Sequence, residues 1–221
     1  RAAREAGARL RTRAAVVGLR REGSAWHATV ASEGRTEELR AEVVVLAAGV
    51  WTRELGRMVG VDLPVEVLGL MMSVTERTGA FLPHLVQHAG TRLSLKQTSE
   101  GNVLVGGGWP ARLVRDALGA PVPGARHCLL PESLEGNARA AVRAVPRLSR
   151  LRVLRTWVGA TTVGPEQLPL VGPVPGAPGV LVATGGSAFT LGPSFARALA
   201  DLAQGARPAV DLSPYDPVRW L

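Results

Sequence analysis

Apolar positions near the start of the chain alternate with polar ones, as they do in short strands. Residues 1–7 end at Gly7 and predict the last turn of a helix. Two alternating segments follow, Arg9–Leu19 and Trp26–Ala31, and the turn signal Glu22-Gly23-Ser24 separates them. They predict a β-hairpin.

The segment Glu42–Leu46 differs because its valines and leucine form a continuous apolar run. Such a run predicts a strand that is covered on both faces, as in a parallel sheet. The small residues Ala47-Ala48-Gly49 follow, and then a short helix that Thr52 would cap and Gly60 would end. A strand, small residues and a helix start can bring the backbone close to a cofactor.

The middle of the chain predicts an antiparallel sheet, with strands at Leu68–Thr75, Arg92–Gln97 and Val103–Gly106 joined by polar turns. An amphipathic helix then ends at Pro146. Its predicted apolar face consists of Leu134, Ala138, Ala141, Val142 and Val145.

The last third returns to strand character at residues 151–158. Residues 159–178 are dense in Gly, Pro and Thr and predict irregular structure. Gly179–Thr184 predicts a buried strand, residues 185–188 a turn, and Pro193–Gln204 a helix with proline at its start. This order is typical of an α/β unit.

Composition narrows the class of protein. Hydrophobic residues make up 46% of the 221 residues, which indicates a globular chain. No uninterrupted apolar run reaches the roughly 18 residues of a membrane-spanning helix. The formal charge is +8, yet the arginines are scattered and aromatic residues are only 4%, so we expect a solvated basic surface and no nucleic-acid partner. We expect a cytoplasmic protein, and peripheral membrane association stays open.

Cysteine and histidine predict no metal site. Cys128 is the only cysteine, which excludes an intrachain disulfide and fits a reducing compartment. Because it precedes Leu129-Leu130, we expect its thiol to be buried and inert. His84 and His88 are four residues apart but lie in a predicted loop, and the four histidines form no cluster of ligands.

Three stretches carry a family resemblance. The first is Ala41–Trp51. The second runs from Leu95-Lys96-Gln97-Thr98 to Gly106-Gly107-Gly108, and the third from Arg155-Thr156-Trp157-Val158-Gly159 to Ala183-Thr184-Gly185-Gly186. In this order and spacing they resemble the FAD-dependent amine oxidoreductases, the family of glycine oxidase, sarcosine oxidase and D-amino-acid dehydrogenase.

The resemblance implies an α/β plus antiparallel β fold, with part of a Rossmann-like FAD-binding domain and an inserted antiparallel substrate domain. We expect residues 1–50 and 156–221 in the FAD domain and residues 51–155 in the substrate domain. No GxGxxG turn for the FAD pyrophosphate occurs in this sequence. We therefore expect the C-terminal part of a longer chain.

The resemblance also implies cofactor-binding residues. Val16 resembles a valine whose backbone meets the adenine of FAD. Ala48 and Gly49 resemble the small residues that let the chain pass close to the FAD. The loop and helix start beside the flavin ring correspond to Gly185, Gly186, Ser187, Ala188, Phe189, Thr190 and Leu191. A helix N-terminus there would stabilise negative charge on the reduced flavin.

The expected substrate residues are less regular. Many relatives have an arginine for the substrate carboxylate at the place of Thr161, and a hydroxyl cannot replace a bidentate guanidinium. Lys96 and Arg92 are the candidates for a replacement cation, since four residues apart on one strand they would share a face. Lys96 ranks first because it lies closer to the family-like Gln97-Thr98. A solvated surface role for Lys96 stays equally open.

By resemblance, the chemistry is hydride transfer from the carbon beside an amine to flavin N5, giving an imine that water hydrolyses. The flavin performs the difficult step, and we assign no catalytic acid, base or nucleophile. The substrate would be an amino acid or another small amine, such as glycine, sarcosine or a D-amino acid. The electron acceptor would be oxygen, a quinone or an electron-transfer partner. Association with other protein subunits stays open. The alternatives are a non-catalytic or interaction subunit of that family and, last, a basic nucleic-acid-binding module.

Overall fold

The computed structural model describes residues 1–117, 119–122 and 124–221. The chain folds into two compact units: unit 1 comprises residues 1–65 and 163–221, and unit 2 comprises residues 66–162. These boundaries differ from the expected breaks near 50 and 155. Helix α2 (Thr52–Met58) packs with strands of unit 1, and strand β10 (Val153–Val163) stays paired in the sheet of unit 2 almost to its end.

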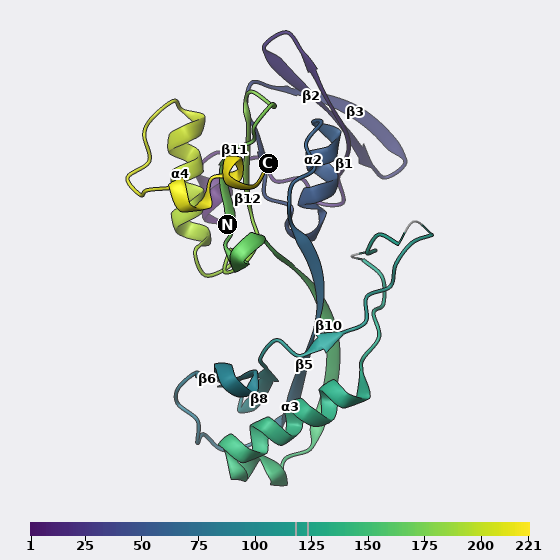
Figure 1. Ribbon diagram of the computed structural model, residues 1–221, viewed down its shortest axis with the longest axis vertical. Helices are drawn as coiled ribbons and strands as arrows, with labels where there is room; N and C mark the ends of the chain where they lie inside the picture. Colours follow the sequence, from purple (N-terminus) through teal and green to yellow (C-terminus); the bar gives the residue numbers. More distant parts are fainter. Residues whose placement is uncertain (118, 123) are drawn as a thin grey trace. The chain divides into compact units, whose positions relative to one another are not determined.

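Unit 1 begins with helix α1 (Ala2–Glu5) and a three-stranded meander that Figure 1 shows as a long ribbon. Its strands are β1 (Ala15–Glu22), β2 (Ala25–Ser32) and β3 (Arg35–Ala41), and neighbouring strands are antiparallel. The predicted hairpin is therefore confirmed. Strand β3 was not predicted, because all of its residues are exposed and it has no apolar alternation.

A second sheet of unit 1 has the order β11-β12-β4. Strand β4 (Val44–Leu46) runs parallel to β12 (Val180–Thr184), and β11 (Leu170–Pro173) pairs antiparallel with β12. Helix α4 (Gly192–Ala203) packs on this sheet. The largest core cluster is formed by Leu19, Trp26, Leu46, Leu63, Val65, Leu170, Val174, Ala177, Val180 and Val182.

Strand β4 corrects one expectation. Leu46 is only 1% exposed and belongs to the core, but Val45 is 45% exposed. Side chains alternate between the two faces of a strand, so these values show that within the described residues only the Leu46 face of β4 is covered. The apolar run was a correct signal for a strand and an incorrect one for cover on both faces.

Unit 2 is one sheet with a helix on one face, and Figure 1 shows helix α3 lying across the strands. The strand order is β10-β5-β8-β7-β6, and β9 also pairs with β5. Its elements are β5 (Glu66–Arg77), β6 (Val86–His88), β7 (Leu93–Gln97), β8 (Asn102–Gly106), β9 (Pro110–Ala111) and α3 (Pro131–Ala144). The predicted combination of α/β and antiparallel structure is confirmed.

The buried face of α3 overlaps the predicted one only in part, because Ala141 belongs to the core and Val142 and Val145 pack against it. Ser133, Asn137 and Ala141 are 1–3% exposed, whereas Leu134 is 38% exposed. The Asn137 Nδ2 donates to the Gly106 carbonyl at 2.9 Å, and this bond satisfies the amide inside the core. The sequence does not reveal this hydrogen bond, and the buried side of α3 therefore includes polar residues beside part of the predicted apolar stripe.

The stretch expected to be irregular, residues 159–178, contains the end of β10 and all of β11. β-branched residues such as Thr161 and Thr162 extend the strand despite the density of Gly and Pro around them. The 3-10 helices are Gly49–Trp51, Ala89–Thr91, Pro146–Arg150, Pro165–Gln167, Ser213–Tyr215 and Pro217–Trp220. Among the helices of the described residues, none has the length and apolar character to cross a membrane.

Candidate functional site

The carboxyl ends of β4 and β12 bring two predicted cofactor segments together in unit 1. Val182 lies opposite Leu46 in the parallel pair, so both strands end at the same edge of the sheet. Thr184 Oγ1 donates to the Gly49 carbonyl at 3.4 Å and joins the two strand ends. Ligands of open α/β sheets bind outside the carboxyl ends of such strands.

The turn after β12 requires glycine at two successive positions. Gly185 has φ +100°, and a Cβ there would lie 3.1 Å from the Pro169 Cα. A Cβ on Gly186 would lie 2.7 Å from the Gln167 carbonyl oxygen, which is closer than real Cβ contacts allow. The turn is therefore pressed against the backbone that precedes β11. By contrast, Gly49 has φ +55° and open space where its Cβ would be.

The turn leads into the N-terminus of α4. Ser187 adopts φ +59°, and its carbonyl accepts from the Leu191 N–H at 3.0 Å. No described side chain caps the first turn of α4. Pro193 has no N–H, and the N–H groups of Gly192 and Phe195 donate to backbone carbonyls, so the Ser194 N–H is the one left for a ligand among the first residues of this helix. Phe189 is 99% exposed, so its ring has no cover within the described chain. Ala188 and Thr190 complete this segment.

Two features near this edge were not predicted from the sequence: a strained loop pair and the burial of Thr52. Glu166 and Gln167 have φ +56° and +60°, a strained pair for residues other than glycine, in the loop that packs against the turn. Thr52 is fully buried and its Oγ1 has no hydrogen-bond partner among the described residues. Thr52 was expected to cap α2, but the residue at the cap position is Trp51 and it makes no side-chain bond.

Val16 does not belong to the sheet of these residues. It lies in β1 of the three-stranded meander. It pairs with Val30 in β1 and β2, beside an irregularity of register, and it is 36% exposed. Its expected contact with the adenine of FAD is not tested by this arrangement and stays a prediction.

Unit 2 has a sheet face opposite α3, which we call the open face. Odd-numbered residues of β5 such as Ser73 face α3, and even-numbered residues such as Met72 are partly exposed on the open face. The Met72 sulfur packs on Gly106, where a Cβ would lie 2.3 Å away. Arg155 lies over the Trp157 ring at 5.7 Å, and both residues belong to this face.

The open face does not bring Thr161 and Lys96 together. Lys96 is opposite Leu104 of β8, which in turn is opposite Val74 of β5. Strand β10 lies beyond β5, so Lys96 and β10 are separated by about 14 Å across three strand spacings. Thr161 lies farther along β10, about 20 Å from the row of Lys96 at the usual rise per residue. The substrate role of Lys96 stays a prediction, but Lys96 cannot take the place of a cation at Thr161.

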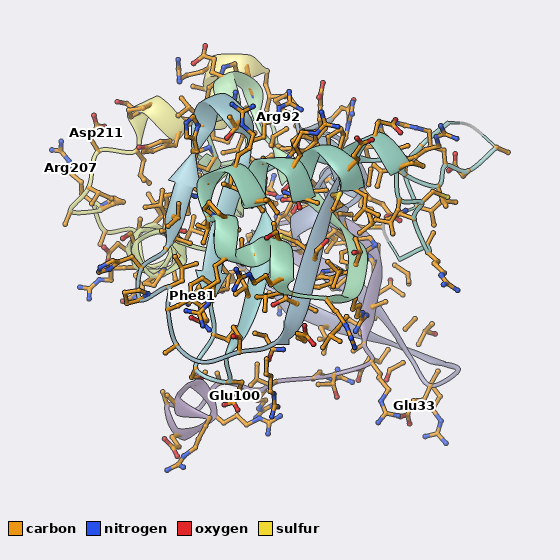
Figure 2. All side chains as sticks on the ribbon, turned by 90° about the horizontal axis from the view of Figure 1, so that it is seen from below. Glu33, Phe81, Arg92, Glu100, Arg207 and Asp211 are labelled. Carbon is orange, nitrogen blue, oxygen red and sulfur yellow. The ribbon has the colours of Figure 1, made fainter. Side chains whose placement is uncertain are left out.

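Arg92 is not part of the strand in which it was expected. Strand β7 begins at Leu93, and Arg92 precedes it with φ +50° at the end of a 3-10 helix. The alternation of a strand therefore does not apply to Arg92, and the argument that it shares a face with Lys96 does not hold. The Arg92 side chain, labelled in Figure 2, is exposed.

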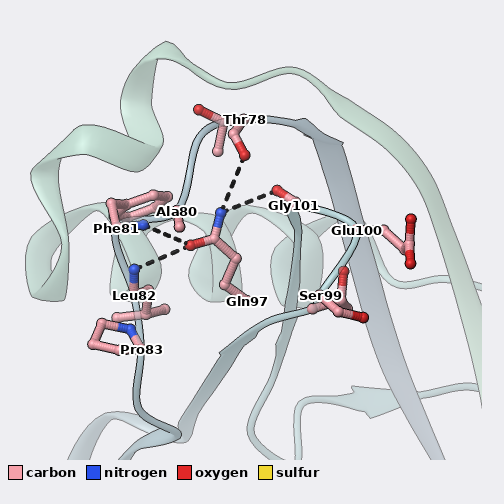
Figure 3. A pocket seen from close by; sticks show the side chains of 10 residues that line it. Thr78, Ala80, Phe81, Leu82, Pro83, Gln97, Ser99, Glu100 and Gly101 are labelled. Atoms are coloured by element: carbon pink, nitrogen blue, oxygen red, sulfur yellow. Dashed lines mark hydrogen bonds between the residues drawn. The ribbon is translucent and has the colours of Figure 1, made fainter.

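A cavity of about 610 Å³ in unit 2 lies beside the β7–β8 turn (Figure 3). Gln97 organises one wall of this cavity. Its Oε1 accepts from the N–H groups of Phe81 and Leu82 at 2.9 and 3.0 Å, and its Nε2 donates to the carbonyls of Thr78, Gly79 and Gly101. Because both ends of the amide are occupied, Gln97 fixes a loop and has no capacity left for a ligand.

In unit 1, Arg53, Arg57 and Asp62 form a cluster of hydrogen-bonded ion pairs. The Arg53 guanidinium donates two 2.7 Å bonds to Asp62 and holds the pKa of that carboxyl well below its usual range, with help from Arg57.

Cys128 is exposed, contrary to expectation, because it pairs with Arg112 across an isolated bridge and not with the core. Among the described residues, no three His, Cys, Asp or Glu side chains lie close enough together to hold a metal ion.

Comparison with known proteins adds to this geometry. Residues 1–202 match the family described as FAD dependent oxidoreductase. The glycine oxidase of Pseudomonas putida is 33% identical over 186 residues, which cover 81% of this chain and 46% of that protein. The chain thus spans about half the length of the curated relatives it matches.

Two solved structures share the fold. The L-proline dehydrogenase from P. horikoshii has a TM-score of 0.85 at 22% identity, covering 99% of this chain and 56% of that one. The glycine oxidase from Geobacillus kaustophilus has a TM-score of 0.78 at 24% identity, covering 100% of this chain and 56% of that one.

Proposed function

Because this chain belongs to the FAD dependent oxidoreductase family, we propose that it serves the oxidation of an amino acid or a related small amine. FAD is the cofactor of that family. Relatives at about this level of similarity include a glycine oxidase, which is named for an amino-acid substrate. The observation that carries the proposal is the pairing of two small-residue turns at the carboxyl ends of β4 and β12.

The residues of this edge fit one side of a flavin. The open space at Gly49 allows a ring to approach the backbone, and the Ser194 N–H at the start of α4 can stabilise negative charge. We assign Ala48, Gly185, Gly186 and the segment Ser187–Leu191 to the same role. When bound, FAD supplies a two-electron acceptor for the hydride of the carbon beside the amine.

We assign substrate binding to the open face of unit 2. Its partly exposed apolar side chains can receive the carbon skeleton of an amino acid, and its hydroxyl and cationic groups can bind the polar end. The resulting imine is hydrolysed by water, so the proposal needs no side chain as catalytic acid or base. Oxygen and a quinone or electron-transfer partner are the candidate acceptors.

The test uses the purified protein that contains this chain. We expect flavin absorbance in the visible range, and bleaching of that absorbance when glycine, sarcosine, proline or D-alanine is added without oxygen. Lactate, which has a hydroxyl group where alanine has an amine, is the matched control and should leave the flavin oxidised. A colourless protein, or a flavin that none of the amino acids reduces, would contradict the proposal.

A further inference from the structure

The open face carries an arginine that the sequence did not single out. Strand β9 pairs with β5 so that Ala111 lies opposite Gly69. Continuing this antiparallel register by one residue places Arg112 opposite Leu68. Leu68 is 37% exposed, so an arginine and an apolar side chain are neighbours at this end of the sheet.

The neighbours of Arg112 fix the direction of its side chain. A Cβ on Gly69 would lie 3.0 Å from Leu113 Cδ2, so Leu113 occupies the α3 side of the sheet. Because side chains alternate along an extended chain, Arg112 points to the open face, as Leu68 does. Two backbone hydrogen bonds of 3.0 Å with Cys128 hold the Arg112 backbone in this extended geometry.

Thr161 belongs to the same row of the sheet. The Ser73 and Thr156 hydroxyls are 3.0 Å apart, which fixes these two residues as neighbours on the α3 side of β5 and β10. Counting along the antiparallel strands from that pair places Thr161 opposite Leu68 and on the open face. Arg112 and Thr161 then flank Leu68 from its two sides, about 10 Å apart across two strand spacings.

The Arg112 guanidinium is a cation without a counter-ion in the part of the chain that the structure describes, since no ion pair or side-chain hydrogen bond joins it to a described residue. Glu66 shares the open face but is not within the 4.0 Å of an ion pair with it. Arg155 of this face is already placed on the Trp157 ring, and Arg77, which lies opposite Asn102, belongs to the other end of β5. Arg112 is thus the guanidinium best able to accept an external carboxylate.

We infer that Arg112 binds the carboxylate of an α-amino acid, with the Thr161 hydroxyl as a further donor and Leu68 as an apolar neighbour. This inference rests on the proposed function, because only an amino-acid substrate supplies the carboxylate. A guanidinium can pair with a carboxylate through two parallel hydrogen bonds, and a neighbouring hydroxyl can add a third. The two residues thereby set the specificity for an acid over a simple amine.

The test measures flavin reduction in the holoprotein by stopped flow across concentrations of glycine, sarcosine and proline. In Arg112→Leu the apparent dissociation constant of the best of these should rise roughly 10- to 150-fold, as expected for a lost charge-assisted bond. The limiting reduction rate should change far less, and Arg112→Lys should recover part of the affinity. Arg150→Leu, which removes an exposed guanidinium outside the open face, is the matched control and should leave both values unchanged.

Cys128 gives a second readout that does not depend on a variant. It lies directly opposite Arg112 in the bridge and its side chain is exposed, so a ligand on Arg112 should shield the thiol. We expect alkylation of Cys128 by iodoacetamide to slow several-fold at saturating amino acid. An unchanged alkylation rate would overturn the placement of the carboxylate, even if Arg112→Leu did not fold.

The outcomes separate the two proposals. If no amino acid reduces the wild-type flavin, the proposed function is overturned and the substrate assignment with it. If the wild type is reduced and Arg112→Leu keeps its dissociation constant, only the role of Arg112 is overturned. A large rise in Lys96→Met with none in Arg112→Leu would instead place the carboxylate at the far end of the sheet.

Discussion

The two units differ in what forms their candidate sites. In unit 1 the site is made of backbone: Gly49, Gly185 and Gly186 leave space or accept close contact, and the start of α4 presents the Ser194 N–H. In unit 2 the site is made of side chains that stand on one face of a sheet. A backbone site fails when a Cβ is added, whereas a sheet-face site fails when one side chain is exchanged. Each kind of change therefore probes one unit.

The largest effect should follow from Gly186→Val. A Cβ would lie 2.7 Å from the Gln167 carbonyl oxygen, and the branched side chain cannot move away from a backbone atom. We expect the protein to lose its flavin while unit 2 stays folded. Absorbance after gel filtration measures the flavin, and hydrogen exchange of unit 2 peptides measures the fold.

Gly79→Ala is the matched control for that variant. A Cβ on Gly79 meets nothing within 4 Å, so the protein should keep its flavin. Full flavin content in Gly186→Val would show that the turn after β12 does not border the cofactor, and the contrast between backbone and side-chain sites would lose its main support.

The next effect tests whether the two units unfold separately. Leu95 is fully buried in the core of unit 2 and Leu63 in that of unit 1. Leu95→Ala should cost about 2–5 kcal/mol and should lower the exchange protection of unit 2 peptides only. Leu63→Ala should do the same in unit 1. Equal losses in both units from either variant would show that the chain unfolds as one cooperative body.

A smaller effect sharpens the description of α3. Asn137→Ala removes the bond to the Gly106 carbonyl and leaves a buried acceptor without a partner, which should cost about 1–3 kcal/mol. Leu134→Ala, on the predicted apolar face but 38% exposed, should cost less than Asn137→Ala. Thermal unfolding of the two variants compares them directly. A larger loss of stability in Leu134→Ala than in Asn137→Ala would mean that the predicted apolar side of α3 contributes more to stability than the buried amide.

The strands and turns around the backbone site could be predicted from the sequence more fully than the sheet face of unit 2, for a physical reason. Apolar runs identify Val44–Leu46 and Val180–Thr184 as strands, and glycines identify the turns that follow them. Both signals are local, so the sequence contains them. The parallel pairing that brings Gly49 to Thr184 is not local, and no local pattern in the sequence specifies it.

The sheet-face site depends on pairing that no local pattern specifies. Arg112 follows a two-residue strand that has no periodicity to detect, and its place beside Leu68 depends on the register of β9 with β5. Lys96 was a candidate because it lies on a predicted strand of the substrate-side sheet and a lysine can bind a carboxylate as a point charge. The strand order then separated it from Thr161, an outcome that the spacing in the sequence could not indicate.

The smallest effect concerns the charge cluster of unit 1. Because Arg53 and Arg57 lower the pKa of Asp62 in the folded state, the ionised carboxylate adds stability above its unfolded pKa of about 3.9. That contribution is lost as the pH falls through the lower folded pKa. The Asp62 side chain is 52% exposed, so solvent screening limits the expected cost of Asp62→Asn to about 0.5–1 kcal/mol at pH 7. Urea unfolding followed by hydrogen exchange in α2 should show this difference at pH 7 and a smaller one at pH 3. A constant difference across that range would mean that packing, and not the charge of Asp62, stabilises this corner of unit 1.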